Sequence, residues 1–303
     1  MATDDRTPTQ LASVSQLGLR SSNQDRVLAR HSIAGTIIAV ADGMGGMEAG
    51  DQAAEASVRL LERWFQTGVA FTHDAFLSAV QGANRAVHQS AVDSGLAGRT
   101  GTTLVACVIQ GTRYLVANAG DSRCYYINNH SARCLTRDHS RVQALVNQGA
   151  MSEETARKSP FRNELTNSLG EPHEIRVDVT PREPFYGVID EDCALLVCSD
   201  GLHAWVTDEE MFDALLAAPS LEQGCAALIE LALRNGSTDN MTVAAVECGR
   251  LARKGESSVR RNPWGGGSGN LCELVRGVWR WSLCSRRRMC SGQRRAAPCC
   301  WAG

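Results

Sequence analysis

The 303-residue sequence has no long apolar run and no hydrophobic leader. Nowhere does it approach the ~18 consecutive apolar residues that cross a bilayer, so we expect no membrane span. Its first residues, Met1–Asp5, show neither the basic nor the apolar segment of a secretory leader, which favours a cytoplasmic protein. Seven of its 12 cysteines precede residue 249, and none of these belongs to a Cys-x-x-Cys pair. We therefore expect reduced structural thiols and no zinc site.

A net charge of -2 hides a strong asymmetry along the chain. Residues 250–303 contain 12 Lys and Arg against 2 Asp and Glu, whereas residues 1–249 contain 19 against 31. An acidic body argues against nucleic acid as its main partner. We expect a globular, monomeric domain at 8–249, followed by a basic tail at 250–303 that is disordered. The alternative for this tail, which holds four of the six tryptophans, is a membrane-surface segment.

The order of strand and helix patterns predicts the fold class. Apolar runs typical of strands lie at Ala12–Leu17, Thr36–Val40, Thr103–Ile109, Tyr114–Ala117, Cys124–Ile127, Arg176–Val179, Ala194–Cys198 and Thr242–Val246. Helical periodicity lies at Ala49–Phe65, Asp74–Ala91, Asp208–Ala217 and Leu221–Arg234. Strict βαβ alternation is missing, so we expect an α/β (α+β) fold: a four-layer αββα sandwich, with two central antiparallel sheets flanked by helix pairs. The polar segment 141–170 is expected to be a flap-like surface insertion.

Four aspartates, widely separated in the sequence, stand where apolar strands begin or end. Asp42 and Asp200 each follow such a run and precede a glycine. Asp121 follows the run that ends at Ala119, and Asp239 comes just before the last run. A lone Asp-Gly is most often a turn, but the same context four times predicts one shared rim. Carboxylates that meet at such a rim repel one another unless cations hold them.

Oxygen ligands without a nearby histidine select hard ions, which means Mn²⁺ or Mg²⁺. Two such ions sharing a carboxylate would lower the pKa of a bound water and stabilise charge on phosphate oxygens. A polar loop that follows the first expected strand adds an anion-binding group. Arg20 can bind a phosphate through its planar guanidinium, and Asp25 can hold metal-bound water.

Together with these acids, short motifs in a fixed order make the chain similar to the metal-dependent protein phosphatases of type 2C, the PPM family, in their compact bacterial form. The motifs, which span about residues 10–248, are Arg20 with Asn23-Gln24-Asp25, Ala41-Asp42-Gly43-Met44-Gly45-Gly46, Gly101-Thr102-Thr103, Ala119-Gly120-Asp121-Ser122-Arg123, Leu135-Thr136-Arg137-Asp138-His139-Ser140, Leu165 to Gly170, Cys198-Ser199-Asp200-Gly201-Leu202 and Thr238-Asp239-Asn240-Met241-Thr242. Each motif is weak alone, and the ordered set is specific.

The resemblance implies how the metal ions are bound. Asp42 would bridge two Mn²⁺ or Mg²⁺ ions, and the Gly43 carbonyl would complete one coordination sphere. Asp200 and Asp239 would bind the other ion. A weaker third ion would lie at Asp121 with help from Asp200.

The resemblance also implies the catalytic and substrate-binding groups. Arg20 would hold the substrate phosphate and, with Asp42 and Asp239, form the catalytic set, while Asp25 would act on an ion through water. The flap at 141–170 would lie beside the site and influence substrate choice.

Two positions depart from the family pattern. Met44 stands where eukaryotic members usually have a histidine that could act as general acid. Many bacterial members lack this histidine too, so the proton for the leaving group would come from elsewhere, for example from metal-bound water. The flap reads Ser159-Pro160 where many relatives have His-Pro. His139, near the flap entry, is expected to be a hydrogen-bonded structural residue, with a catalytic role as the less favoured alternative.

The implied function is hydrolysis of phosphoserine and phosphothreonine in proteins by metal-activated water, opposing a bacterial Ser/Thr kinase. One alternative keeps the chemistry but acts on small phosphoesters or on a signalling-switch phosphoprotein. A second is a non-catalytic phospho-binding module, which the retention of Arg20, Asp42, Asp200 and Asp239 disfavours.

Overall fold

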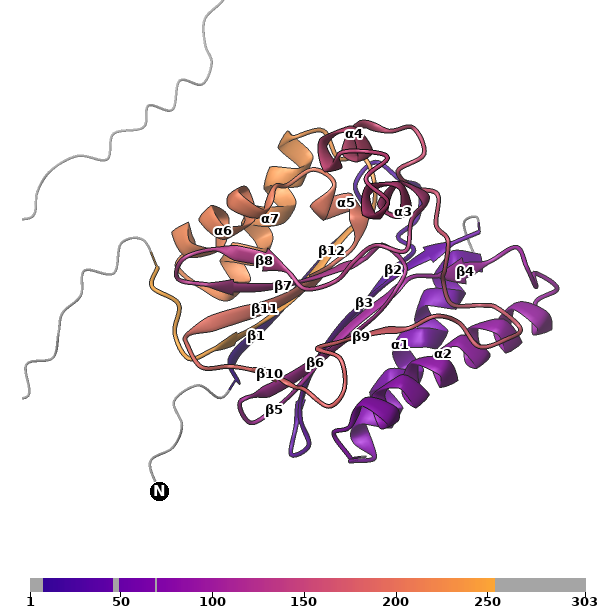
Figure 1. The fold of residues 1–303 in the computed structure, drawn as a ribbon, viewed down its shortest axis with the longest axis horizontal. Coiled ribbons are helices and arrows are strands. Elements are labelled where there is room, and N and C mark those ends of the chain that lie inside the picture. Colours follow the sequence, from indigo (N-terminus) through magenta and orange to yellow (C-terminus); the bar gives the residue numbers. More distant parts are fainter. Residues whose placement is uncertain (1–7, 46–48, 69, 254–303) are drawn as a thin grey trace, which may run out of the picture. The chain divides into compact units, whose positions relative to one another are not determined.

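A computed structural model of the chain describes residues 8–45, 49–68 and 70–253 (Figure 1). The chain divides into two units, 1–257 and 258–303, and only the first contains described residues. Helices of the described residues include none that is long and apolar enough to cross a membrane.

One sheet has seven strands, all paired antiparallel. Its main path runs β10-β6-β5-β3-β2, with β4 paired to β3 and β9 paired to β6. The strands are β2 (Asp25–Ser32), β3 (Gly35–Met44), β4 (Gly101–Thr102), β5 (Leu104–Gln110), β6 (Arg113–Ala119), β9 (Asp178–Thr180) and β10 (Gly187–Val188).

The second sheet has five strands in the order β1-β12-β11-β7-β8, again all antiparallel. Its strands are β1 (Pro8–Gln16), β7 (Arg123–Asn128), β8 (Ala132–Cys134), β11 (Cys193–Cys198) and β12 (Met241–Cys248).

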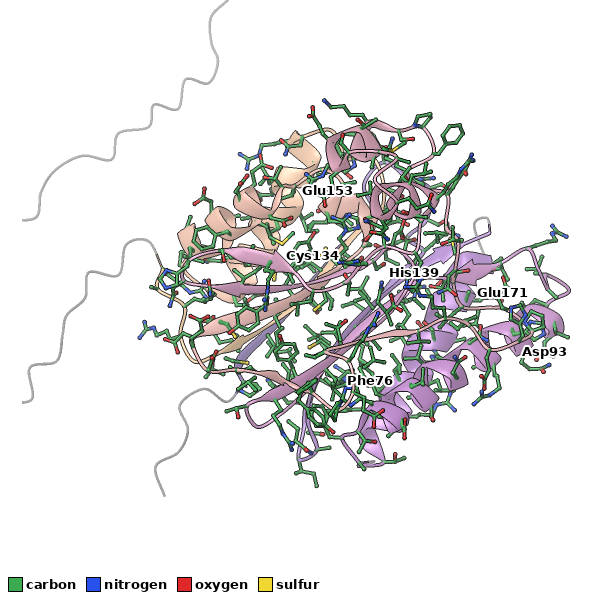
Figure 2. All side chains as sticks on the ribbon, in the orientation of Figure 1. Phe76, Asp93, Cys134, His139, Glu153 and Glu171 are labelled. Atoms are coloured by element: carbon green, nitrogen blue, oxygen red, sulfur yellow. The ribbon has the colours of Figure 1, made fainter. Side chains whose placement is uncertain are left out.

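Helices cover the outer faces of both sheets (Figure 1). The pair α1 (Ala49–Gln66) and α2 (His73–Asp93) packs on the seven-stranded sheet. Phe76 of α2, labelled in Figure 2, stacks on Trp64 with ring centroids 5.5 Å apart. Helices α5 (Asp200–His203), α6 (Asp208–Ala217) and α7 (Leu221–Arg234) pack on the five-stranded sheet.

Strand β3 shows how the sequence builds these layers. Ile37 and Ala39 point to the helices α1 and α2, whereas Ile38 and Val40 point into the layer between the two sheets. Both faces are buried, so the strand reads as a continuous apolar run instead of an alternating one. The predicted four-layer sandwich with two central antiparallel sheets is confirmed.

Local structure adds details that the sequence patterns did not predict. Strand β2, which begins at Asp25, was not predicted. The flap, whose sequence has a helical character, contains two short helices, α3 (Arg141–Asn147) and α4 (Glu153–Lys158). The base of the flap is closed by an antiparallel bridge between Ser140 and Leu165. A second antiparallel bridge, between Leu169 and Thr102 of β4, attaches the end of the flap to the seven-stranded sheet.

The start of the expected tail is packed on the body. Leu251 is buried, and the buried Arg253 forms an ion pair with Glu247 of β12. Arg253 also donates a 3.1 Å hydrogen bond to the carbonyl of Leu215. The rest of the expected tail, 254–303, lies outside the described residues.

Candidate active site

One pocket of about 400 Å³ brings together most of the residues that the sequence singled out. Its lining includes Arg20, Asp42, Gly43, Asp121, Asp200 and Asp239. Asp25 does not line this pocket, but it pairs with Asp42 in the register of β2 and β3. The five aspartates thus gather at one rim of the sandwich, although more than 200 residues separate the first from the last.

The strands explain this convergence. Asp42 lies near the end of β3, and Asp121 follows β6 in the same sheet. Asp200 begins α5 directly after β11, and Asp239 precedes β12. Each sheet therefore contributes acids to the same rim, and each of these acids lies in a strand or within two residues of one, which holds it on rigid backbone.

Asp42 is held through its backbone by two threonines. Its amide donates to Thr103 Oγ1 at 3.0 Å, and its carbonyl accepts from Thr102 Oγ1 at 2.9 Å. Thr103 Oγ1 is itself 2.7 Å from the hydroxyl of Ser122. The two threonines therefore satisfy the backbone amide and carbonyl of Asp42. Its carboxylate is not needed for that purpose and can serve the pocket.

Asp25 is 2% exposed and carries an unsatisfied oxygen. Ser199 donates a 2.8 Å hydrogen bond to Oδ2, while Oδ1 has no hydrogen-bond partner among the described residues. Burial raises the pKa of Asp25 to about 6; hydrogen bonds from Thr242 and Ser199 oppose this rise, and the charges of Asp200 and Asp239 add to it. A buried acceptor without a partner is costly and is best explained by water or an ion that binds there.

The other acids of the rim show the same electrostatic strain. Burial, followed by the charges of its carboxylate neighbours, raises the pKa of Asp42 well above its usual range. Burial and then the charge of Asp200 do the same for Asp121. The pKa of Asp200 is also raised, by burial and by Asp239. Carboxylates that are hard to ionise together form a site that a cation would stabilise.

The donor set can be tested for its fit to particular ions. Among residues 8–45, 49–68 and 70–253, no three His, Cys, Asp or Glu side chains stand so that they alone could hold an ion. Mg²⁺ and similar ions need only one or two carboxylates, because waters and carbonyl oxygens fill the rest of the shell. The pocket offers oxygen ligands, includes Gly43, and is lined by no described histidine or cysteine. These donors fit hard, water-retaining ions and do not suit a closed zinc site.

Arg20 lies at the edge of the pocket with its side chain 59% exposed. Its Nη2 donates to Oδ2 of Asp239 at 2.7 Å. This hydrogen bond, and then the charge of Asp239, raises the pKa of Arg20. A guanidinium has further N–H donors, so Arg20 can bind Asp239 and an incoming anion together.

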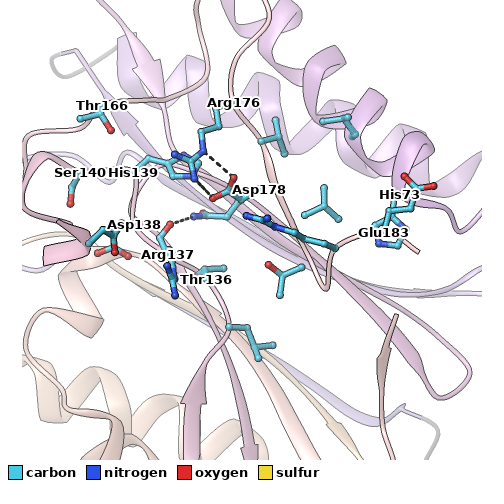
Figure 3. A pocket seen from close by; sticks show the side chains of 18 of the residues that line it. His73, Thr136, Arg137, Asp138, His139, Ser140, Thr166, Arg176, Asp178 and Glu183 are labelled. Carbon is cyan, nitrogen blue, oxygen red and sulfur yellow. Dashed lines mark hydrogen bonds and ion pairs between the residues drawn. The ribbon is translucent and has the colours of Figure 1, made fainter. Parts of the chain in front are cut away.

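His139 does not line the carboxylate pocket. It lines a larger pocket of about 800 Å³, shown in Figure 3, together with Asp178 and Arg176. Its Nδ1 accepts from the Asn167 side chain at 2.8 Å, and its Nε2 lies 3.1 Å from Asp178 Oδ2. Both ring nitrogens are thus engaged, which favours the structural role. We place the candidate active site at the pocket of about 400 Å³, because it is lined by Asp42, Asp200 and Asp239 together, whereas the pocket of His139 is lined by none of them.

Sequence reasoning missed a second histidine that supports the rim. His203 is buried and donates from Nε2 to the carbonyl of Asp121 at 2.9 Å. Burial, followed by the charge of Arg123, lowers the pKa of His203 to about 3, so it stays neutral and anchors the backbone at Asp121. Its place in helix α5, three residues after Asp200, gave no pattern that could have revealed this bond.

Three comparisons with known proteins identify the family of the chain. The family model for protein phosphatase 2C matches residues 15–228. A serine/threonine phosphatase, Stp, of Listeria welshimeri is 37% identical over 227 residues, covering 73% of this chain and 88% of that protein. Given these matches, the chain belongs to the protein phosphatase 2C family.

Solved structures show the same fold. The Streptococcus agalactiae serine/threonine phosphatase is 32% identical with a TM-score of 0.71, covering 78% of this chain and 98% of that one. The catalytic domain of the phosphatase PstP, solved with two manganese ions, is 30% identical with a TM-score of 0.68, covering 80% and 98%. The protein is therefore a metal-dependent protein phosphatase.

Proposed function

We propose that the protein hydrolyses phosphoserine and phosphothreonine in other proteins with the help of two divalent ions, Mn²⁺ or Mg²⁺. The observation that carries the proposal is the gathering of Arg20, Asp42, Asp200 and Asp239 around one pocket. The names of the similar bacterial proteins, which are serine/threonine phosphatases, support the substrate class. Neither the small-ester alternative nor the non-catalytic alternative has an observation of its own in its favour.

Different residues of the chain would bind the metal ions and the phosphate. Asp42, the Gly43 carbonyl, Asp200 and Asp239 would hold the two ions. When bound, the ions supply a water of lowered pKa and neutralise charge on the phosphate oxygens. Arg20 would bind the phosphate and orient it for in-line attack by water.

Water is the natural nucleophile, because the described cysteines are poor candidates. Cys107 and Cys198 are fully buried inside strands, and burial raises the pKa of Cys198 well above its usual range. A neutral, inaccessible thiol cannot attack a phosphate. The reaction would therefore proceed in one step, without a phosphoenzyme.

Three finer assignments accompany this mechanism. Asp121, with Asp200, would form a weaker third ion site, and Asp25 would hold ion-bound water through its unpartnered oxygen. Manganese is the first choice for the resident ion because a similar structure contains two manganese ions. Asn163 and Leu165 of the flap line the pocket, so the flap would contact the substrate.

We also propose a cellular setting. The protein would act in the cytoplasm and reverse the work of a Ser/Thr kinase. Its seven described cysteines are all free thiols, which suits a reducing compartment. Deletion of the gene in its host should raise phosphothreonine levels, and unchanged levels would contradict this setting.

A phosphothreonine-peptide assay tests the function. Activity should appear with Mn²⁺ or Mg²⁺ and vanish with EDTA, and Asp239→Asn should lower kcat by orders of magnitude while the fold is kept. The control Asp93→Asn, at the exposed C-terminal end of α2 and outside the lining of the pocket, should keep full activity. Faster turnover of small phosphoesters than of the peptide would favour the alternative substrate class, and normal activity of Asp239→Asn would refute the metal site.

A further inference from the structure

Asn240 joins the two halves of the site. The loop of residues 17–24, which we call the Arg20 loop, connects β1 to β2 and carries Arg20. Asn240 is 6% exposed and follows Asp239 directly. Its Nδ2 donates to the carbonyls of Leu17 at 2.9 Å and Ser22 at 3.1 Å. Its Oδ1 accepts from the amide of Gln24 at 2.8 Å.

These three bonds settle the orientation of the Asn240 amide. Two carbonyl oxygens need donors and one amide needs an acceptor, so exchanging Oδ1 and Nδ2 would break all three bonds. The bonds also span the Arg20 loop, from Leu17 at its start to Gln24 at its end. One buried side chain therefore fixes both ends of the loop.

The Arg20 loop is held mainly by polar bonds. None of its residues 17–24 is buried, and Leu19 at its tip is 79% exposed. Its apolar burial therefore contributes little, and polar bonds have to maintain its shape. Besides the bonds from Asn240, the Leu19 amide donates to the Thr238 carbonyl at 3.0 Å, and the side chain of Asn23 donates to Ser15 Oγ at 2.9 Å. The segment 238–240 is the attachment that reaches the loop at its start, at its tip and at its end.

The same segment carries the carboxylate of Asp239. Oδ1 of Asp239 accepts from the backbone amide of Asn240 at 2.8 Å, and Oδ2 accepts from Arg20 at 2.7 Å. Gly18 packs so closely on this segment that a Cβ there would lie 2.1 Å from the Asp239 carbonyl oxygen. The Arg20 loop and the Asp239 segment therefore form one rigid unit.

From this arrangement we infer that Asn240 is a positioning residue for Arg20. It sets the phosphate-binding guanidinium at a fixed distance from the metal-binding carboxylate. Asn240 also lines the pocket, but both polar atoms of its side chain bond the backbone of the Arg20 loop. The expected change in KM rests on the proposed function, whereas the expected loosening of the Arg20 loop does not. Without the clamp, the Arg20 loop should sample many conformations, and substrate binding would then pay for ordering it.

Hydrogen exchange on the metal-free protein tests the structural part. In Asn240→Ala, the amides of residues 19–24 should exchange about tenfold or more faster, the expected loss for one to three hydrogen bonds. Amides of β11 should exchange as in the wild type. The matched control is Asn235→Ala, which removes an amide that donates to the Trp205 carbonyl at 2.7 Å and does not bond the loop. Unchanged exchange in residues 19–24 would overturn the clamp.

Kinetics and calorimetry test the functional part. Asn240→Ala should raise KM for a phosphothreonine peptide about tenfold or more while kcat falls less, and Asn235→Ala should change neither. The Mn²⁺ affinity, measured by titration calorimetry, should change less than KM, because Asp239 stays in place. A normal KM with a loosened loop, or an equal loss in Mn²⁺ affinity, would refute a role in positioning Arg20.

If Asn240→Ala does not fold, a more conservative variant tests the same bonds. Asn240→Asp keeps the volume and the acceptor for Gln24 but loses both donors, so exchange should rise near Leu17 and Ser22. If the wild type has no phosphatase activity, the proposed function fails, whereas the exchange data still decide the clamp. In that case inorganic phosphate serves as the probe, and its affinity should fall in the uncharged variant Asn240→Ala but not in Asn235→Ala; an equal affinity in Asn240→Ala would overturn the inference.

Discussion

Removing the charge of Asp25 should stabilise the metal-free protein near neutral pH. Burial raises the pKa of this carboxyl from 3.8 to about 6. At ~1.36 kcal/mol per pKa unit, this shift corresponds to about 3 kcal/mol. Because the pKa of Asp25 is higher in the folded state than in the unfolded state, protonation of this carboxyl favours folding. Its contribution to the free energy of unfolding is complete below about pH 4 and is lost as pH rises through about 6. Asp25→Asn cannot ionise, so it escapes this loss.

Urea denaturation in EDTA between pH 4 and pH 7.5 measures the effect. Relative to the wild type, the free energy of unfolding of Asp25→Asn should rise by up to about 3 kcal/mol across this range. The variant should also relieve Asp42. Among the neighbouring charges that raise the pKa of Asp42, that of Asp25 is the largest, and Asp25→Asn removes it. The exposed control Glu230→Gln should differ from the wild type by a constant small amount.

Metal ions should reverse this advantage. With saturating Mn²⁺, a cation offsets the repulsion among the carboxylates, so the wild type should become as stable as Asp25→Asn or more stable. A difference between Asp25→Asn and the wild type that stays constant from pH 4 to 7.5 would refute the reasoning. The reasoning would also be refuted if Asp25→Asn kept its full stability advantage over the wild type in saturating Mn²⁺.

Three further predictions concern the surroundings of the rim. Arg20→Ala should raise KM about tenfold or more, with only partial recovery in Arg20→Lys because lysine lacks the planar fork; a normal KM would remove Arg20 from the phosphate site. Gly18→Ala should cost more than about 1 kcal/mol, since φ is +64° and the added Cβ meets backbone; an unchanged Tm would contradict this. Arg123→Ala leaves Asp138 without its two hydrogen bonds of 2.9 and 2.8 Å, which should cost about 3–5 kcal/mol in chemical denaturation. Adding Asp138→Leu should recover part of that loss, and no recovery would argue against the pair.

The fold was predictable where strands are buried on both faces. Runs such as Thr36–Val40 and Ala194–Cys198 pack between a helix layer and the other sheet, so they contain almost no polar residues. Strand β2 was not predicted from the sequence, because it lies at the edge of its sheet. Arg26 and Arg30 of β2 pair with Glu55 and Glu62 of α1, and these charges interrupt the apolar pattern.

Asp42, Asp121, Asp200 and Asp239 were predictable for the same reason, because each lies beside the end or the start of a buried strand. The groups that hold them were not. Thr103 reaches Asp42 across 61 residues, and Ser199 reaches Asp25 across 174. Threonine and serine at those positions are equally compatible with ordinary strand ends. Their roles depend on which strands become neighbours, and periodicity carries no such information.

The bond between Ser199 and Asp25 shows why metal binding and folding should be one equilibrium. Ser199 follows β11 of the five-stranded sheet, whereas Asp25 begins β2 of the seven-stranded sheet. Their 2.8 Å hydrogen bond therefore ties the two sheets together at the rim. Ionised carboxylates on both sheets push that rim apart, and the apolar layer behind it, which includes Val40 and Val197, holds it closed. Cations would remove the repulsion and leave only the attractive contacts, so occupancy of the site should tighten the whole sandwich.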